Sequence, residues 1–413
     1  MKRTSTGMRR VDLSQVELAS SETARSINRD IVLQIIRSRQ PISRAELARL
    51  SGLQRSTVSL IIEQLIEEEW VREGAVARKP RGRRPTLLGL NEDLVIIAVD
   101  IRPEQSSVAV VDLNGRLLAR SLMPLSADPA TAIDLLVDNI LRCKESLPRK
   151  SVEGIGISLP GRVDPKTERL IFAPNLHWPQ FDIKEAIERK TGLPVAMENA
   201  ANACLLAELW FGHMDGVRNA VLVTISEGIG TGIFANGHLV TGKDGMAGEF
   251  GHAPLQADGP LCACGRKGCW EQFASCRAAV HYYTEISHAA KALTFQQLLN
   301  AAEGGDEHAA EALAKQANYV GQGLRLIMAG LAPEVILIAG DVTSAWRRFA
   351  PIIEAQMTAF TFAGSAPRLL PTHEGEVARL RGAAALMMQQ RSIGDDSRRP
   401  SSTSRRPSRR KQP

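Results

Sequence analysis

The sequence predicts an α/β protein in which a winged helix-turn-helix precedes a larger region of alternating strands and helices with a cysteine-rich loop. Two amphipathic helical patterns flank a Ser-Gly turn at residues 51–52, which is typical of a helix-turn-helix. From residue 94 onward, apolar strand patterns alternate with helical patterns, as they do in α/β domains. Three of the six cysteines fall within residues 262–269, which marks a loop with its own chemistry.

The helix-turn-helix is expected within residues 26–90. Residues 1–25 mix Ser, Thr, Arg and Glu without apolar periodicity, so we expect a flexible arm there. Helical patterns follow at residues 26–39, 44–50 and 55–68. The third has apolar side chains at i, i+3, i+4, i+7 and i+8, which predicts a buried stripe. Residues 70–90 predict a short β-wing, which completes the domain.

The exposed start of the third helix and the tip of the wing are candidate DNA contacts. The helix start carries side chains able to hydrogen-bond bases or phosphates, namely Gln54, Arg55, Ser56, Thr57 and Ser59, and Arg55 is the best candidate for a base contact. The wing tip contains Arg81, Arg83 and Arg84, a cluster suited to phosphates or a narrow minor groove. The alternative is a helix cap and a solvated charge run. We favour DNA because both features occur in one domain.

Charge is distributed unevenly along the chain. Residues 1–90 carry a net charge of +7 and residues 391–413 carry +6, which leaves −7 for the segment between them. The basic N-terminal and C-terminal segments indicate that both ends of the chain bind a polyanion. The tail at 391–413 is rich in Arg, Ser and Pro, so we expect it to be disordered. We find no signal peptide and no apolar run long enough for a bilayer, and we expect a cytoplasmic protein without membrane contact.

The elements of the α/β region can be placed in order. Strands are predicted at 94–100, 107–113, 116–122, 154–159, 194–198, 220–226, 232–240 and 334–339. Helices are predicted at 130–146, 200–211 and 376–390, and the chain beyond the cysteine-rich loop is mainly helical. A glycine loop at 228–232 lies within the hairpin at 220–240.

The cysteine-rich loop predicts a zinc site. Cys262, Cys264 and Cys269 follow a Cys-x-Cys-x4-Cys spacing with two glycines between them, and His252 lies close upstream. Three thiolates and one imidazole fill a tetrahedral Zn²⁺ sphere, so the ion would be structural. Scattered core cysteines and a disulfide-stapled secreted loop are the alternatives; the glycines and the lack of a paired cysteine framework argue against them. Glu249 and Glu271 flank the site. Because the coordination sphere is already filled, we expect both carboxylates to face something other than the metal.

In combination, these motifs resemble the ROK family (repressors, open reading frames and kinases), specifically its winged-helix repressors. The resemblance covers residues 26–390 and rests on Glu249-Phe-Gly-His252, Cys262-Ala-Cys264-Gly-Arg-Lys-Gly-Cys269-Trp-Glu271, Ile157-Ser-Leu-Pro-Gly161, Ala173-Pro-Asn175-Leu-His-Trp178, Glu198-Asn199-Ala-Ala-Asn202, Ile229-Gly-Thr-Gly232 and Gly82-Arg-Arg-Pro85. It implies a two-lobed, actin-like ATPase or sugar-kinase-type fold behind the winged helix. The expected lobes are residues 91–198 with 376–390, and residues 199–375.

The resemblance also implies functional residues. His252, Cys262, Cys264 and Cys269 match the family's zinc ligands. The sugar-binding positions are Gly161, Asn199, Glu249, His252 and Glu271. The implied protein is a repressor that binds a double-stranded DNA operator under the control of a monosaccharide or sugar phosphate. Because such operators are two-fold symmetric, we expect a homodimer or homotetramer.

Two departures from the family's kinases indicate that this chain is not an enzyme. Asp100 is followed by Ile101-Arg102-Pro103 where the kinases have Asp-Gly-Gly-Thr, and the position of the catalytic aspartate is Ala200. A methyl group cannot act as a base, and proline removes an amide from a phosphate-binding loop. A bifunctional ATP-dependent sugar kinase and a regulator controlled by a protein partner are the alternative hypotheses.

Overall fold

The computed structural model describes residues 21–76, 86–103, 105–173, 176, 178, 181–212, 214, 216–288, 293–359, 365–372 and 377–392. Arg81, Arg83 and Arg84 at the predicted wing tip lie outside the described residues, as do residues 1–20 of the predicted arm and 393–413 of the predicted tail. The chain divides into two compact units. Of the described residues, the smaller unit contains 21–68, 73–76, 86–89 and 389–392, and the larger contains 69–72 and those between 90 and 388.

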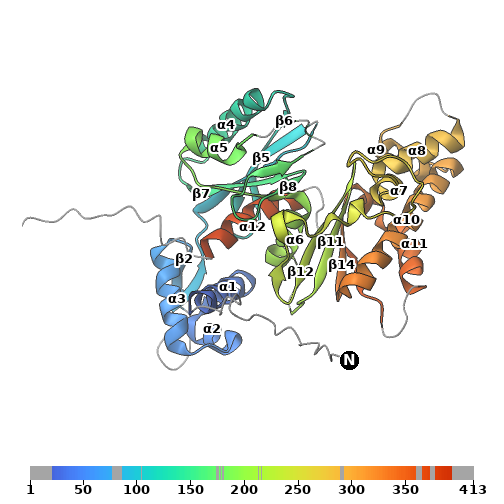
Figure 1. Ribbon diagram of the computed structural model, residues 1–413. Coiled ribbons are helices and arrows are strands. Elements are labelled where there is room, and N and C mark those ends of the chain that lie inside the picture. The colour runs from blue at the N-terminus through green and yellow to red at the C-terminus, as the bar shows by residue number, and fades with distance from the viewer. Residues whose placement is uncertain are drawn as a thin grey trace, which may run out of the picture. The chain divides into compact units, whose positions relative to one another are not determined.

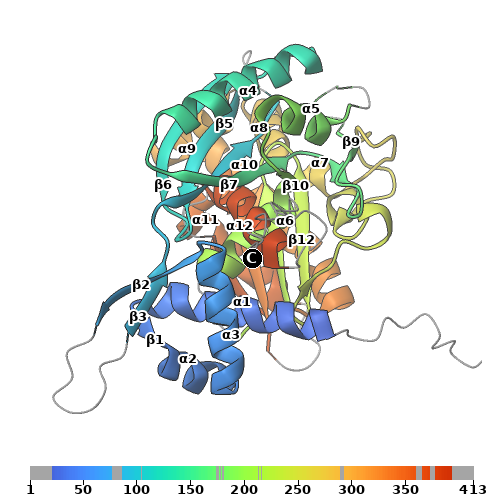
Figure 2. The same ribbon diagram turned by 90° about the vertical axis from the view of Figure 1, so that its left-hand side faces the viewer.

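The smaller unit has the elements of a winged helix (Figure 2). Its helices are α1 (Ser21–Arg39), α2 (Arg44–Ser51) and α3 (Arg55–Glu67). Its sheet has the order β1-β3-β2, formed by β1 (Ile42–Ser43), β3 (Thr86–Leu90) and β2 (Val71–Val76). Helix α1 begins at Ser21, so the last five residues of the span predicted as an arm are helical instead.

Local sequence explains the turn between α2 and α3. The Ser43 side chain caps α2 by accepting a hydrogen bond from the Glu46 amide, and α2 ends at Gly52 in the left-handed conformation. The predicted stripe on α3 is buried, with Val58, Ile61, Ile62 and Leu65 all in the core. Arg29 of α1 forms an ion pair of 2.5 Å with Glu68, just beyond α3. The stripe thus fixes which face of α3 points outward.

The larger unit contains two five-stranded sheets. The first sheet has the order β10-β7-β4-β5-β6, from β4 (Leu94–Asp100), β5 (Gln105–Asp112), β6 (Leu117–Pro124), β7 (Ser151–Leu159) and β10 (Val195–Asn199). The second has the order β13-β12-β11-β14-β15, from β11 (Ala220–Ile225), β12 (Ile229–Ala235), β13 (His238–Leu239), β14 (Val335–Gly340) and β15 (Arg368–Pro371). The hairpin of β8 (Arg162–Val163) and β9 (Leu170–Phe172) leaves the first sheet after β7. Neither β15 nor this hairpin was predicted.

Helices cover both sheets and separate them (Figure 1). Helices α4 (Pro129–Glu145) and α5 (Ile183–Thr191) pack on the outer face of the first sheet. Helices α6 (Ala200–Phe211) and α12 (Ala378–Ser392) lie between the sheets. The far side of the second sheet is covered by α7 (Glu271–Ala274), α8 (Cys276–Ser287), α9 (Phe295–Glu303), α10 (Glu307–Leu331) and α11 (Trp346–Thr358). None of the helices that the structure describes has the length and apolar character of a membrane-spanning segment.

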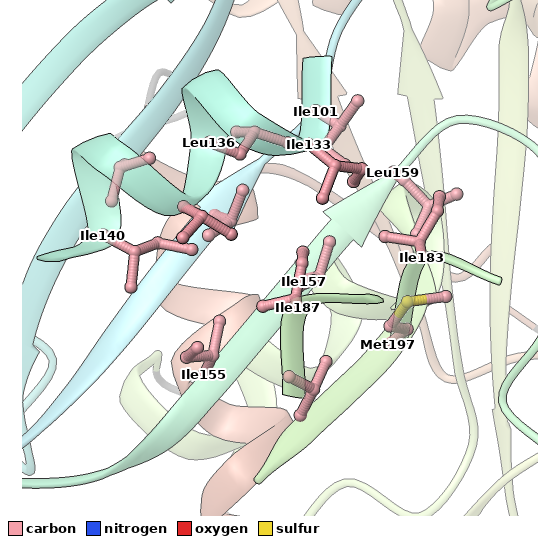
Figure 3. Packing of buried hydrophobic residues seen from close by; sticks show 14 of the residues in the cluster. Ile101, Ile133, Leu136, Ile140, Ile155, Ile157, Leu159, Ile183, Ile187 and Met197 are labelled. Carbon is pink, nitrogen blue, oxygen red and sulfur yellow. The ribbon is translucent and has the colours of Figure 1, made fainter. Parts of the chain in front are cut away.

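The core of the first sheet is built from aliphatic side chains (Figure 3). Ile155 and Ile157 of β7 are fully buried against Leu136 and Ile140 of α4 and Ile187 of α5. On the opposite face, Gly156 lets α12 lie directly on the strand, since a Cβ there would be 1.7 Å from the Ala383 carbonyl oxygen. This packing holds the carboxyl ends of β4, β7 and β10 at one edge of the sheet.

Candidate functional site

The predicted metal ligands lie on a loop that folds back on itself. It starts in the short 3-10 helix η3 (Glu249–His252) and ends where α7 begins at Glu271. The Leu255 amide donates to the Gly268 carbonyl at 2.8 Å, and the Cys262 amide donates to the Arg266 carbonyl at 2.7 Å. The first bond joins the two arms of the loop near its ends, and the second closes the turn that carries Cys262 and Cys264.

The ligand atoms of His252, Cys262, Cys264 and Cys269 all lie within 4.8 Å of one another. The Sγ atoms of Cys264 and Cys269 are 3.6 Å apart, and Cys262 Sγ is 3.5 Å from His252 Nδ1. A tetrahedral zinc ion with ordinary bond lengths separates two sulfurs by about 3.8 Å and a sulfur and a nitrogen by about 3.6 Å. The predicted grouping is confirmed, and its two shortest separations match those of a tetrahedral zinc site.

The surroundings of the Glu271 carboxylate differ in part from the expectation that it faces a bound molecule other than the metal. It is buried, and its Oε1 accepts a hydrogen bond from Cys262 Sγ at 2.9 Å. Burial, together with this carboxylate, raises the pKa of the Cys262 thiol, whereas a divalent cation would favour the thiolate. The second oxygen, Oε2, lies beside Gly228 in the turn between β11 and β12. Residues 229–232 of the predicted glycine loop are part of strand β12 instead. Glu271 therefore touches both the metal cluster and the cavity beside it.

A cavity of about 700 Å³ lies beside this loop and is lined by residues from both sheets of the larger unit. All five predicted sugar-binding residues line it, namely Gly161, Asn199, Glu249, His252 and Glu271. Glu249 Oε2 is 3.8 Å from His252 Nε2, while the other ring nitrogen, Nδ1, lies beside Cys262. The Asn199 side-chain oxygen caps α6 by accepting from the Asn202 amide at 2.8 Å, which fixes the orientation of its amide group.

Gly161 follows β7 and has φ of +111°. A Cβ at this position would lie 2.3 Å from the Phe172 carbonyl oxygen in β9. Only glycine tolerates both the conformation and the contact. It allows the β8–β9 hairpin to close against the cavity.

Four arginines that no sequence motif assigned to the site also line the cavity, namely Arg102, Arg162, Arg266 and Arg379. Two of them share one carboxylate. Arg102 Nε lies 2.7 Å from Asp100 Oδ2, and Arg379 Nη1 lies 3.7 Å from Asp100 Oδ1. Burial disfavours the charged form of Arg102, but attraction to Asp100 and Asp341 outweighs it and raises the pKa. No local pattern points to Arg379, because it comes from α12, far along the chain from β4.

The position that resembles the catalytic aspartate of the kinases is the first residue of α6. Ala200 lines the cavity next to Asn199. The neighbouring Glu198 is half-buried, and desolvation raises the pKa of its carboxyl group. Its Oε1 accepts a hydrogen bond from the Asn199 amide at 2.8 Å.

The predicted DNA contacts are clustered at the start of α3 in the smaller unit. Gln54, Arg55 and Ser56 are exposed, whereas Thr57 and Ser59 are half-buried. Gln54 occupies the N-cap position of α3, and its side chain makes no capping bond to this helix. Leu60, 65% exposed on the same helix, was missed because it falls outside the polar pattern.

Comparisons with known proteins cover nearly the whole chain. Residues 96–390 match the model of the ROK family, and residues 31–73 match the model of the MarR family. The xylose repressor of Bacillus subtilis (strain 168) is 30% identical, over 90% of this chain and 98% of its own length.

Two solved structures are similar in fold. The ROK family transcriptional regulator that is a homolog of the E. coli MLC protein has a TM-score of 0.77 and 26% identity, covering 90% of this chain and 97% of its own. The ROK family glucokinase from Streptomyces griseus, in complex with glucose and AMPPNP, has a TM-score of 0.67 and 30% identity, covering 71% of this chain and 99% of its own. The similarity to the glucokinase covers less of this chain.

Proposed function

The chain belongs to the ROK family, and from this premise we propose that it is a transcriptional repressor whose affinity for a DNA operator is controlled by a sugar. The observation that carries this proposal is the cavity in which Glu249, His252 and Glu271 converge. Sugar hydroxyls donate to carboxylates, and such charge-assisted hydrogen bonds contribute roughly 1.5–3 kcal/mol each. The relatives named as a repressor and a transcriptional regulator support the same conclusion.

We assign the metal a structural role. His252, Cys262, Cys264 and Cys269 would hold Zn²⁺ in a closed sphere, and the ion would supply a rigid anchor for the loop rather than an open coordination position. Glu249 and Glu271 flank this anchor in the chain, so the cluster would fix where their carboxylates meet the sugar. Asn199 and Gly161 would complete the binding site from the first sheet.

The winged helix would read the operator through the start of α3. Arg55 would contact a base, the polar residues beside it would bind bases or phosphates, and Leu60 would contact a thymine methyl group. A two-fold symmetric operator would require a homodimer or homotetramer. A sugar can change operator affinity only if it binds the DNA-competent and DNA-incompetent arrangements with different affinities.

We propose that the cavity does not transfer phosphoryl groups. Ala200 cannot accept a proton from a sugar hydroxyl, and Arg102 and Pro103 follow β4 where close approach of backbone amides to phosphate is needed. The similarity to a glucokinase favours a sugar kinase as the second candidate. Incubation with ATP, Mg²⁺ and a sugar panel separates the two, because sugar-dependent ADP release would support the kinase.

The DNA-binding part of the proposal is tested with Arg55→Ala. We expect operator affinity to fall by about 1–3 kcal/mol, the value of a direct base contact, while sugar binding stays unchanged. Binding isotherms on operator and random DNA provide the readout. An equal loss on both DNAs would show that Arg55 contacts only phosphate, and no loss on either would exclude it from the interface. Glu63→Gln, further along α3, is the matched control.

A further inference from the structure

We propose that Arg102 and Arg379 form a subsite for the phosphate group of a phosphorylated sugar. This inference rests on the proposed function and makes it more specific. It assigns the effector a charged group, and it assigns two residues of this chain to that group.

Both guanidinium groups reach the cavity and share one buried carboxylate. Asp100 is 2% exposed, and it is approached by Arg102 at 2.7 Å and by Arg379 at 3.7 Å. Arg102 uses Nε for this contact, and within the described part of the chain its two terminal nitrogens have no hydrogen-bond partner. The Arg102 side chain is 40% exposed and that of Arg379 is 16% exposed. Asp100 thus hydrogen-bonds Arg102 and attracts Arg379 without a hydrogen bond, which leaves N–H groups of both guanidinium groups for an oxyanion.

The subsite lies at the right separation from the sugar-binding residues. Asp100 and Glu198 both pair with Ser158 of β7, so β4, β7 and β10 end level with one another. Arg102 follows β4, and Asn199 ends β10. Because adjacent strands are about 4.8 Å apart, their backbones are separated by roughly 10 Å across the intervening strand. A sugar ring bonded to Asn199 and carrying a phosphate ester on an exocyclic carbon can bridge this distance.

The backbone adds positive potential at the same place. Ala200 and Ala201 form the first turn of α6, and Arg379 is the second residue of α12; all three line the cavity. The N-terminal ends of two helices of more than eight residues therefore approach the arginines, and helix N-termini stabilise anions. Asp341 is the acidic group in the cavity wall that also attracts Arg102, so a bound phosphate must compete with it.

Calorimetric titration of matched pairs tests the subsite: glucose with glucose 6-phosphate, and xylose with xylose 5-phosphate, with inorganic phosphate and ADP as further probes. We expect the phosphorylated member of at least one pair to bind about tenfold tighter or more. Arg102→Gln should weaken binding of that member roughly 10- to 100-fold and leave the neutral sugar unchanged. Asp341→Asn should strengthen it, because a competing carboxylate is removed.

Controls separate binding from folding. In Arg102→Gln the buried Asp100 carboxylate keeps Arg379 as an ionic partner at 3.7 Å, and thermal unfolding checks the fold of this variant. Arg120 is exposed on β6 and lies outside the cavity wall. Arg120→Gln should therefore change neither the affinity for the neutral sugar nor that for the phosphorylated sugar. The inference is overturned if the neutral and phosphorylated sugars of every pair bind with equal affinity. It is also overturned if Arg102→Gln weakens binding of both sugars equally. Either result leaves the proposed function standing. If inorganic phosphate or ADP binds and no sugar phosphate does, the inference is overturned, and the ligand of the two arginines is a free phosphate or a nucleotide. If no sugar or sugar phosphate binds, the proposed function fails with it.

Discussion

The two walls of the cavity are built in different ways. The wall from the second sheet carries Glu249, His252 and Glu271 on one continuous loop, closed by the Cys/His cluster. The wall from the first sheet collects Arg102, Gly161 and Asn199 from the ends of three strands and Arg379 from α12. One wall depends on a local loop held by four side chains. The other depends on the whole sheet and on Gly161, where the backbone of β9 passes close by.

This difference predicts how each wall responds to damage. Loss of one ligand from the cluster should release the entire loop, because a structural zinc site contributes folding free energy directly. A change at one strand end should disturb one position, since the neighbouring strands remain hydrogen-bonded. Three variants test the contrast, in decreasing order of expected effect.

Cys264→Ser should have the largest effect. The half-buried Cys264 is one of three sulfurs in the cluster, and its loss should release zinc and free the segment that carries Glu249 and Glu271. We expect sugar affinity to fall by about 100-fold or more, since both charge-assisted contacts are lost. Metal analysis and calorimetry measure the two consequences. Cys143→Ala, a buried cysteine on α4 outside the cluster, should retain zinc and sugar binding. A zinc-free Cys264→Ser protein with normal sugar response would refute the structural role.

Gly161→Ala should have an intermediate effect on the other wall. The added Cβ would lie 2.3 Å from the Phe172 carbonyl oxygen at φ of +111°, so the β8–β9 hairpin must move. We expect unfolding free energy to fall by about 1–3 kcal/mol and sugar affinity to fall, with zinc content unchanged. Chemical denaturation and calorimetry provide the measurements.

Gly192→Ala is the matched control for this variant. Gly192 has φ of +67° at the end of α5, with no atom within 4 Å of its would-be Cβ. It therefore carries the cost of the left-handed conformation without the collision, and it should leave sugar affinity intact. If both variants affect sugar affinity equally, close approach at Gly161 is not what shapes the wall.

The same contrast explains how much could be predicted from sequence. Helix α6 has the predicted limits, Ala200–Phe211, because its apolar pattern and its capping residue are adjacent in the chain. The Cys/His cluster was predicted from spacing for the same reason, and it is confirmed. The contact of Arg379 with Asp100 was not predicted, since the two residues are brought together only when α12 packs between the sheets. The start of α1 at Ser21 was also missed, because polar residues in its first turn hide the helical period.

Glu249→Gln should have the smallest effect, and it tests whether the loop's carboxylates act independently of the metal. Glu249 is exposed, and its only described ionic contact is with His252 at 3.8 Å. Glutamine keeps the size and one acceptor but removes the charge, so we expect sugar affinity to fall about three- to tenfold, the difference between charged and neutral hydrogen bonds. Zinc content and thermal stability should not change. Asp258→Asn, an exposed residue of the same loop outside the cavity wall, is the matched control and should bind sugar normally. A loss as large as that of Cys264→Ser, or release of zinc, would mean that Glu249 supports the metal loop rather than the sugar, and the two walls would then differ less than their construction indicates.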